Sequence, residues 1–145
     1  MAIIESSIMI EKPVEEVWNF LTDLTNNGPK FQPGLIEMRQ TSSGPVGVGT
    51  TFQSKRTNGT FLFRITEYEP NRRLTIEFTS GAISGSRYVS NLENMGGKTK
   101  LTLTAEPKLG GFYRLLGPFV IRNIKKENET ALNNLKRILE STAPS

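Results

Sequence analysis

The chain of 145 residues contains no cysteine and no histidine. The absence of cysteine excludes disulfides, thiolate nucleophiles and cysteine-ligated zinc or iron-sulfur centres. The absence of histidine removes the commonest general base and the commonest metal ligand, so a transition-metal site is not expected. Any catalysis would have to use carboxylates, lysine, arginine, tyrosine, hydroxyls or amides. We therefore predict neither a metal nor a cofactor.

The sequence also lacks a long hydrophobic run and a dense basic cluster. No apolar run approaches the roughly 20 residues of a membrane-spanning helix. The opening "MAIIESSIMIEK" lacks the basic start and the uninterrupted apolar core of a signal peptide. The formal net charge is +4, but lysine and arginine occur singly or in pairs, whereas nucleic-acid-binding proteins carry a denser basic face. We predict a cytoplasmic protein that does not bind nucleic acid.

The order of sequence patterns predicts an α+β fold. A β-rich opening stretch stops at Lys12, and Pro13 starts a helix because proline suits the first helical position. The following "TNNGPKFQPG" permits at most a short helical turn that carries Phe31. Turn residues then divide six strands, after which the period becomes helical from about Phe112 to about Ser141, with a kink or interruption at Gly117 and Pro118. The predicted strands are 35–40, 50–56, 61–68, 74–79, 86–93 and 99–106.

Apolar and polar residues alternate along the later strands, which indicates a sheet with one apolar face. The alternation is clearest in 74–78 and in 101–105. A sheet of this kind must cover its apolar face, and the last helix is the only element long enough to do so. We therefore expect about seven antiparallel strands packed on a long C-terminal helix, with one or two short helices after the first strand.

Five segments, in this order, carry a resemblance to a known family: "SIMIEKPVEEVWNFLTDLTN", "VGVGTTF", "FRITEYEPNRRLTIEF", "GGKTKLTLT" and "NETALNNLKRILES". They resemble the START/Bet v 1-like (SRPBCC) superfamily, and most closely its polyketide cyclase/dehydratase-like branch. The resemblance implies a helix-grip fold, in which a curved sheet wraps around the long helix, as a single domain over 1–141 with a disordered tail at 142–145. It also implies a hydrophobic cavity between helix and sheet that holds a lipid, a polyketide or another apolar molecule.

Aromatic and aliphatic side chains on the inner face of such a fold would form the core and the cavity wall together. They come from the predicted strands, from the short helical turn and from the start of the long C-terminal helix. Our candidates for lining the cavity and contacting its ligand are Phe31, Phe52, Tyr88, Leu101, Phe119 and Val120.

Glu127 is the most unusual residue of the predicted helix. Its position falls within an apolar stripe that includes Val120, Ile124 and Ala131. No basic residue lies three or four positions away, so a partner would have to come from the sheet, where Arg64 and Arg87 are the mid-strand candidates. An unpaired buried carboxylate would cost several kcal/mol, so water, a sheet partner or a polar ligand group is required.

Three polar neighbours, Asn123, Thr130 and Asn134, flank Glu127 on the same side of the predicted helix. Three interpretations of Glu127 stay open. It is a hydrated or ion-paired carboxylate, a contact that orients a ligand together with Asn123, or a weak candidate for a catalytic acid or base with Tyr88 or Arg87 as its companion.

Three functions follow from the fold and the resemblance. The first is binding or transport of a small, mostly apolar molecule, and the second is a cofactor-free polyketide cyclase or dehydratase that uses a cavity carboxylate. The third is a protein-interaction module with a filled core. A further expectation concerns 109–126, where large apolar residues mix with Arg114, Arg122, Lys125 and Lys126. We expect this stretch to touch an anionic membrane transiently while a ligand enters or leaves.

Overall fold

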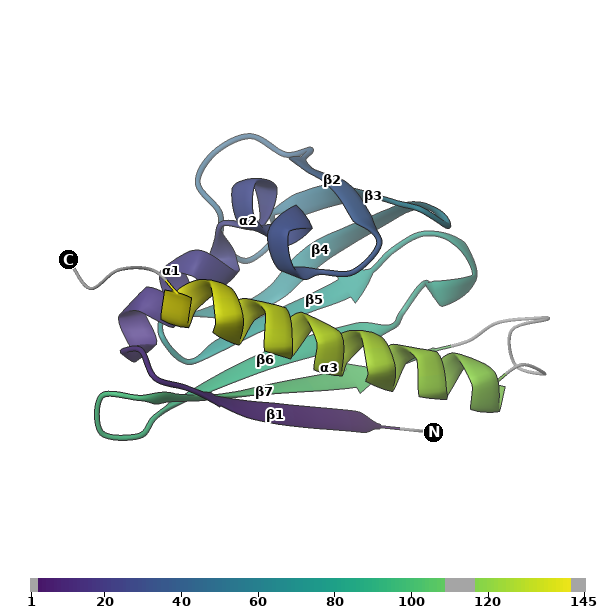
Figure 1. Ribbon diagram of the computed structural model, residues 1–145. Coiled ribbons are helices and arrows are strands. Elements are labelled where there is room, and N and C mark those ends of the chain that lie inside the picture. Colours follow the sequence, from purple (N-terminus) through teal and green to yellow (C-terminus); the bar gives the residue numbers. More distant parts are fainter. Residues whose placement is uncertain (1–2, 109–116, 142–145) are drawn as a thin grey trace.

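The computed structural model describes residues 3–108 and 117–141. Its elements are β1 (Ile4–Ile10), α1 (Val14–Thr22), α2 (Leu24–Phe31), β2 (Leu35–Gln40), β3 (Thr51–Arg56), β4 (Gly59–Glu69), β5 (Arg73–Phe78), the 3-10 turn η1 (Gly81–Ile83), β6 (Arg87–Asn94), β7 (Thr99–Glu106) and α3 (Gly117–Ser141). The seven strands form one antiparallel sheet in the order β1-β7-β6-β5-β4-β3-β2. Figure 1 shows α3 lying across one face of this curved sheet. The predicted α+β helix-grip architecture is confirmed.

The first helix, α1, forms as its sequence predicts. Pro13 precedes it in an extended conformation, and Glu15 and Glu16 occupy its first turn, where negative charge is favourable. The apolar residues at helical spacing, Val17 and Trp18 among them, are buried. This face anchors the helix in the core.

The segment after α1 contains a helix of eight residues, α2, where the sequence predicted no more than a turn. Pro29 lies inside this helix and removes one backbone donor. Packing outweighs that loss, because Leu24, Gly28 and Phe31 are all buried on one side of the helix. Gly28 permits the approach to β2, since a Cβ atom at this position would lie 3.2 Å from Cδ2 of Leu35.

The inner face of the sheet, on which α3 lies, is set by the pairing of the strands. Phe52, Phe63 and Phe78 stand opposite one another on β3, β4 and β5. Ile76, two residues before Phe78 on β5, stands opposite Tyr88 on β6. Because residues that are opposite in register share a face, these side chains all point toward α3.

The long helix α3 packs on the sheet through only part of its length. It begins at Gly117, so Gly117 and Pro118 form its described start, which suits a proline in the first turn. The expected helical residues 112–116 and the expected tail 142–145 lie outside the described residues. The buried side chains of α3 all belong to its second half, and they are Ala131, Leu132, Leu135 and Leu139. The first half therefore covers the sheet without filling the space beneath it.

We expect Leu135→Ala to destabilise the fold, because Leu135 is almost completely buried between α3 and the sheet. Truncation of a buried leucine leaves a void and lowers the free energy of unfolding by about 2–5 kcal/mol. Urea denaturation measures this loss. Lys125→Ala, an exposed position on the same helix, is the control, and equal effects of the two substitutions would contradict the packing described here.

Candidate functional site

A cavity of about 580 Å³ lies between the first half of α3 and the inner face of the sheet. Its volume is within the range of about 300–1,000 Å³ that is typical of small-molecule sites. Most of its wall is apolar, with Phe61, Ile76, Phe78 and Leu103 from the strands. Phe31, at the end of α2, closes one side. The cavity exists because the buried residues of α3 begin only at Ala131.

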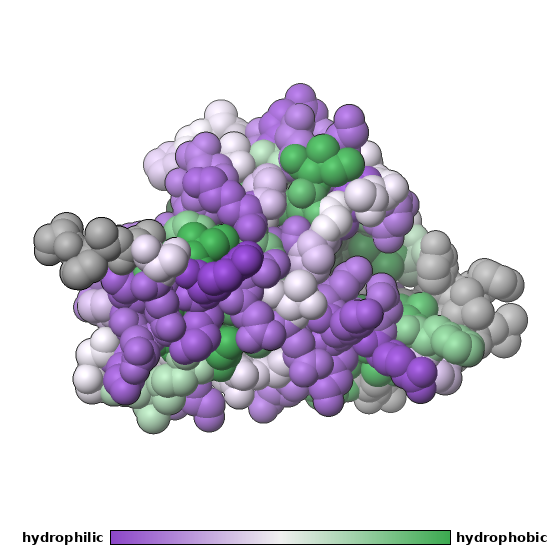
Figure 2. All heavy atoms as spheres, in the orientation of Figure 1, coloured by the Kyte–Doolittle hydropathy of each residue, from purple (hydrophilic) through white to green (hydrophobic). Residues whose placement is uncertain are grey.

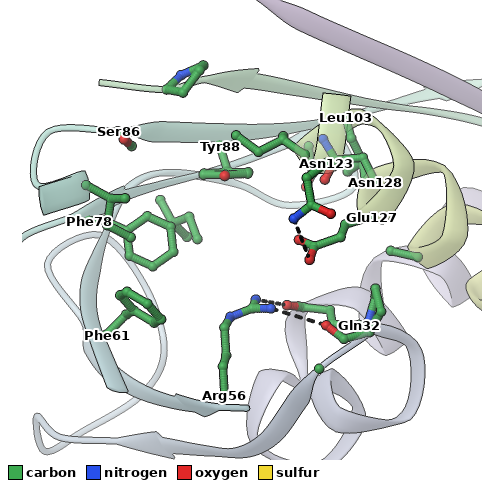
Figure 3. Close-up of a pocket in the computed structure, with 18 of the residues that line it drawn as sticks. Gln32, Arg56, Phe61, Phe78, Ser86, Tyr88, Leu103, Asn123, Glu127 and Asn128 are labelled. Atoms are coloured by element: carbon green, nitrogen blue, oxygen red, sulfur yellow. Dashed lines mark hydrogen bonds between the residues drawn. The ribbon is translucent and has the colours of Figure 1, made fainter. Parts of the chain in front are cut away.

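A small group of polar side chains interrupts this apolar wall. Figure 3 shows Arg56 rising from β3 on one side of the open space and Glu127 reaching in from α3 on the opposite side. Tyr88 lies on the sheet, across the open space from Arg56. The remaining members are Gln32, Asn123 and Asn128.

Arg56 is the last residue of β3 and points into the cavity. It follows Phe52 and Ser54 at a spacing of two, and both of those residues are buried on the inner face. Its Nη2 donates to Oε1 of Gln32 at 2.8 Å, and its Nη1 donates to the carbonyl oxygen of Pro33 at 3.4 Å. Burial lowers the pKa of the Arg56 guanidinium, and the negative charge of Glu127 opposes that shift.

Arg56 is not among the residues predicted for the site, although the sequence contains a pattern that indicates its inward position. The period-two alternation of β3 places Phe52 and Arg56 on the same face, so a buried Phe52 implies an inward Arg56. The arginine belongs to the basic pair Lys55 and Arg56, and only its neighbour Lys55 is exposed.

Glu127 lies at the rim of the cavity and is exposed. Its Oε1 accepts a hydrogen bond from Nδ2 of Asn123 at 3.3 Å. No salt bridge to Glu127 is formed within 3–108 and 117–141. Glu127 is therefore open to solvent and not ion-paired within these residues, and its charge acts on Arg56 from a distance.

Neither Arg64 nor Arg87, the two sheet candidates for pairing with Glu127, forms that pair. Arg64 binds Glu77 at 2.7 Å, and Arg87 lies 3.6 Å from Glu106 and 3.7 Å from Glu67. These residues alternate with the inward side chains of their strands, so they occupy the outer face of the sheet.

Only one of the three polar residues that flank Glu127 on α3 lines the cavity. Asn123 lines it beside Glu127. Thr130 instead bonds back to the carbonyl oxygen of Lys126 at 2.9 Å, and Nδ2 of Asn134 donates to the carbonyl oxygen of Phe31 at 3.1 Å. Asn134 thereby ties α3 to the end of α2.

Tyr88 and Asn128 complete the polar group. Burial raises the pKa of the Tyr88 phenol, with the charge of Arg56 lowering it and the charge of Glu127 raising it further. Nδ2 of Asn128 is buried and has no hydrogen-bond partner among the residues that the structure describes. Such a donor is costly unless something occupies the space in front of it.

Six of the eight predicted site residues line the cavity, and two do not. Those that line it are Phe31, Tyr88, Phe119, Val120, Asn123 and Glu127. Phe52, 1% exposed, stacks on Phe63 with ring centroids 5.3 Å apart. Leu101, 0% exposed, stands opposite Leu92. Both face inward, as expected, but at positions along their strands where the core is already filled. Contact of any of the eight with a ligand stays a prediction.

Phe119, near the start of α3, is 70% exposed although it also borders the cavity. Figure 2 shows hydrophobic residues gathered at this end of the molecule, whereas the outward side of α3 is mostly hydrophilic. Part of the predicted membrane-contact stretch, 109–116, lies outside the described residues, and the contact stays a prediction. Among the described helices, none combines the length and the apolar character needed to cross a bilayer.

This arrangement can hold the polar end of an otherwise apolar molecule. The wall supplies apolar area, while a guanidinium, a carboxylate, a phenol and an amide converge on one region of the cavity. A metal is a poor fit to these groups, since no set of three or more acidic side chains gathers in the described part of the chain.

The sequence matches the family model "Polyketide cyclase / dehydrase and lipid transport" over residues 1–140. The chain belongs to this family. The assignment confirms the resemblance to the polyketide cyclase/dehydratase-like branch of the START/Bet v 1-like superfamily. No curated protein matches the sequence.

Several solved structures share the fold of this protein although their sequences are only distantly similar to it. The protein TTHA0849 from Thermus thermophilus superposes with a TM-score of 0.80 at 17% identity, covering 97% of this chain and all (100%) of that one. The di-domain ARO/CYC BexL, from the BE-7585A biosynthetic pathway, gives a TM-score of 0.78 at 16% identity, over 97% of this chain. This chain spans about half of BexL, 47% of its length. The Aha1 dimer from Colwellia psychrerythraea gives 0.72 at 20% identity, over 97% and 98% of the two chains.

We expect the two charges at the cavity to shift the ionisation of Tyr88 in opposite directions. The phenol of Tyr88 should ionise above its ordinary pKa of about 10 because it is buried. Arg56→Gln removes a charge that stabilises the phenolate and should raise this pKa further. Glu127→Gln removes a charge that disfavours the phenolate and should lower it.

Ultraviolet titration of phenolate absorbance, taken as the difference between each protein and its Tyr88→Phe version, measures these pKa shifts. Lys55→Gln removes a neighbouring charge outside the cavity and should leave the midpoint in place. Equal midpoints in all four backgrounds would show that Arg56 and Glu127 do not face Tyr88.

Proposed function

We propose that this protein binds, and in that way stores or carries, a small and mostly apolar molecule in the cavity beneath the first half of α3. The observation that supports this most directly is the cavity of about 580 Å³ with an apolar wall and a few convergent polar groups. Apolar wall residues exclude water and contribute to affinity through burial, and the polar groups orient what is bound.

The comparisons support the same class of function. The family description joins polyketide cyclases and dehydrases with lipid transport, and a lipid is a largely apolar molecule. An interaction module with a filled core fits less well, because the described residues leave this space open.

We expect native mass spectrometry of the gently purified protein to show a stoichiometric adduct that organic extraction releases. If the purified protein carries none, exposure to a mixture of lipids and polyketides should produce one, because the cavity is preformed. A chain that remains free of adducts after that exposure would contradict the proposal.

Ile76→Trp gives this measurement a site-specific control. Ile76 faces the cavity from β5, and a larger side chain there occupies the volume that a ligand needs. We expect the adduct occupancy of Ile76→Trp to show an affinity for the ligand at least about tenfold lower than that of the unmodified protein. This is a loss of about 1.4 kcal/mol in binding free energy. Ile36→Trp adds the same side chain at an exposed position away from the cavity and should leave binding unchanged.

The second candidate function is a cofactor-free cyclase or dehydratase. It is favoured by the presence of Glu127 and Tyr88 at one cavity and by the structural likeness to the ARO/CYC proteins BexL and StfQ. A carboxylate and a phenol are both able to transfer protons. In that case Glu127→Gln should abolish turnover of a true substrate while the protein still binds it. Turnover that survives the substitution would exclude Glu127 as the acid or base.

A further inference from the structure

The two charged side chains at the cavity both have unused hydrogen-bonding capacity. A guanidinium carries five N–H donors, and two of those on Arg56 bond to Gln32 and Pro33. Within the described residues, its other donors have no partner. Glu127 accepts one bond at Oε1, from Asn123, and its Oε2 has no hydrogen-bond partner in the same residues. Arg56 therefore has donors free for an acceptor group, and Glu127, which is exposed, has an oxygen free for a donor group.

These two groups lie on opposite sides of one space rather than in contact. Figure 3 shows the guanidinium of Arg56 and the carboxylate of Glu127 entering the same open space from different elements, with the ring of Tyr88 on the far side of that space from Arg56. They are close enough for each charge to act on Tyr88, and for Glu127 to act on Arg56. A group placed between them would interact with both.

The charges of Arg56 and Glu127 sum to zero, which determines what kind of polar group fits between them. An anionic group would be attracted by Arg56 and repelled by Glu127, and a cationic group would experience the reverse. A neutral group that offers an acceptor to Arg56 and a donor to Glu127 is favoured by both.

We propose that the cavity selects apolar molecules whose polar end is uncharged and carries an acceptor and a donor together, as a primary amide or a hydroxy ketone does. The acceptor binds Arg56 and the donor binds the carboxylate of Glu127, while the apolar remainder lies against Phe61, Phe78 and Leu103. This inference rests on the proposed function and specifies its class of ligand.

The test compares linear probes of ten carbon atoms that differ at one end: decanamide, decanoate, decylamine and 2-decanone. Their affinities are measured at neutral pH by displacement of the neutral dye Nile red from the full chain. For the unmodified protein we expect decanamide to bind at least about tenfold more tightly than each of the other three, as expected when one charged group or one hydrogen-bond partner is mismatched.

Two substitutions should change this selectivity in opposite directions. Glu127→Gln leaves the positive charge of Arg56 unbalanced, so decanoate should gain about tenfold or more relative to decylamine. Arg56→Gln leaves the carboxylate unbalanced, so decylamine should gain relative to decanoate. Glu129→Gln on α3 and Lys55→Gln on β3 remove the same charges outside the cavity and should preserve the original order. Because Glu127 is exposed, Glu127→Gln should fold normally and decides the question even if Arg56→Gln does not fold.

The outcomes separate this inference from the proposed function. If the four probes bind equally, or if decanoate is the tightest in the unmodified protein and Glu127→Gln does not change the order, the inference is overturned and the binding function stands. If Nile red and all four probes fail to bind, the binding function is overturned and the inference falls with it.

Discussion

The packing of Leu132, Leu135 and Leu139 against the sheet is the interaction on which the rest of the structure depends. These residues hold the second half of α3 in the core. The first half continues in the same direction over the sheet, and none of its side chains is fully buried. The cavity is the space left by this geometry, and loop residues such as Pro33 and Asn58 complete its wall.

The sheet separates its charged groups by face. On the outer face, Arg64, Glu77, Arg87 and Glu106 stand in register across four strands and form ion pairs, Arg64 with Glu77 and Arg87 with Glu106. Exposed pairs of this kind contribute little to stability, because water already solvates both charges. On the inner face, Arg56 has neutral acceptors in direct contact and a carboxylate only at a distance. Its charge therefore remains available to whatever enters the cavity.

The sequence predicted the fold well because alternation, turn residues and helical periodicity agreed from one end of the chain to the other. The sequence also placed Glu127 at the cavity, because helical periodicity shows which residues of the last helix face the sheet. Some errors came from a local signal that was not used, and others from information that is not local. Arg64 and Arg87 were chosen for their mid-strand position, whereas strand parity directs them outward and directs Arg56 inward. Phe52 and Leu101 face inward as expected. How far the cavity extends along each strand, however, depends on where α3 packs against the sheet. A second short helix was allowed for, but α2 is longer than the single turn predicted for its segment, since burial of Leu24 and Phe31 outweighs Pro29.

Trp18 is the single tryptophan of the chain, and its place in the fold has a practical consequence. It is 4% exposed, its ring meets the edge of Tyr68 with centroids 5.2 Å apart, and it is not part of the cavity wall. Its intrinsic fluorescence therefore reports whether α1 remains docked in the core, and an occupant of the cavity does not touch it. One sample can thus provide two separate optical signals, with indole emission for the integrity of the fold and an added dye for the occupancy of the site.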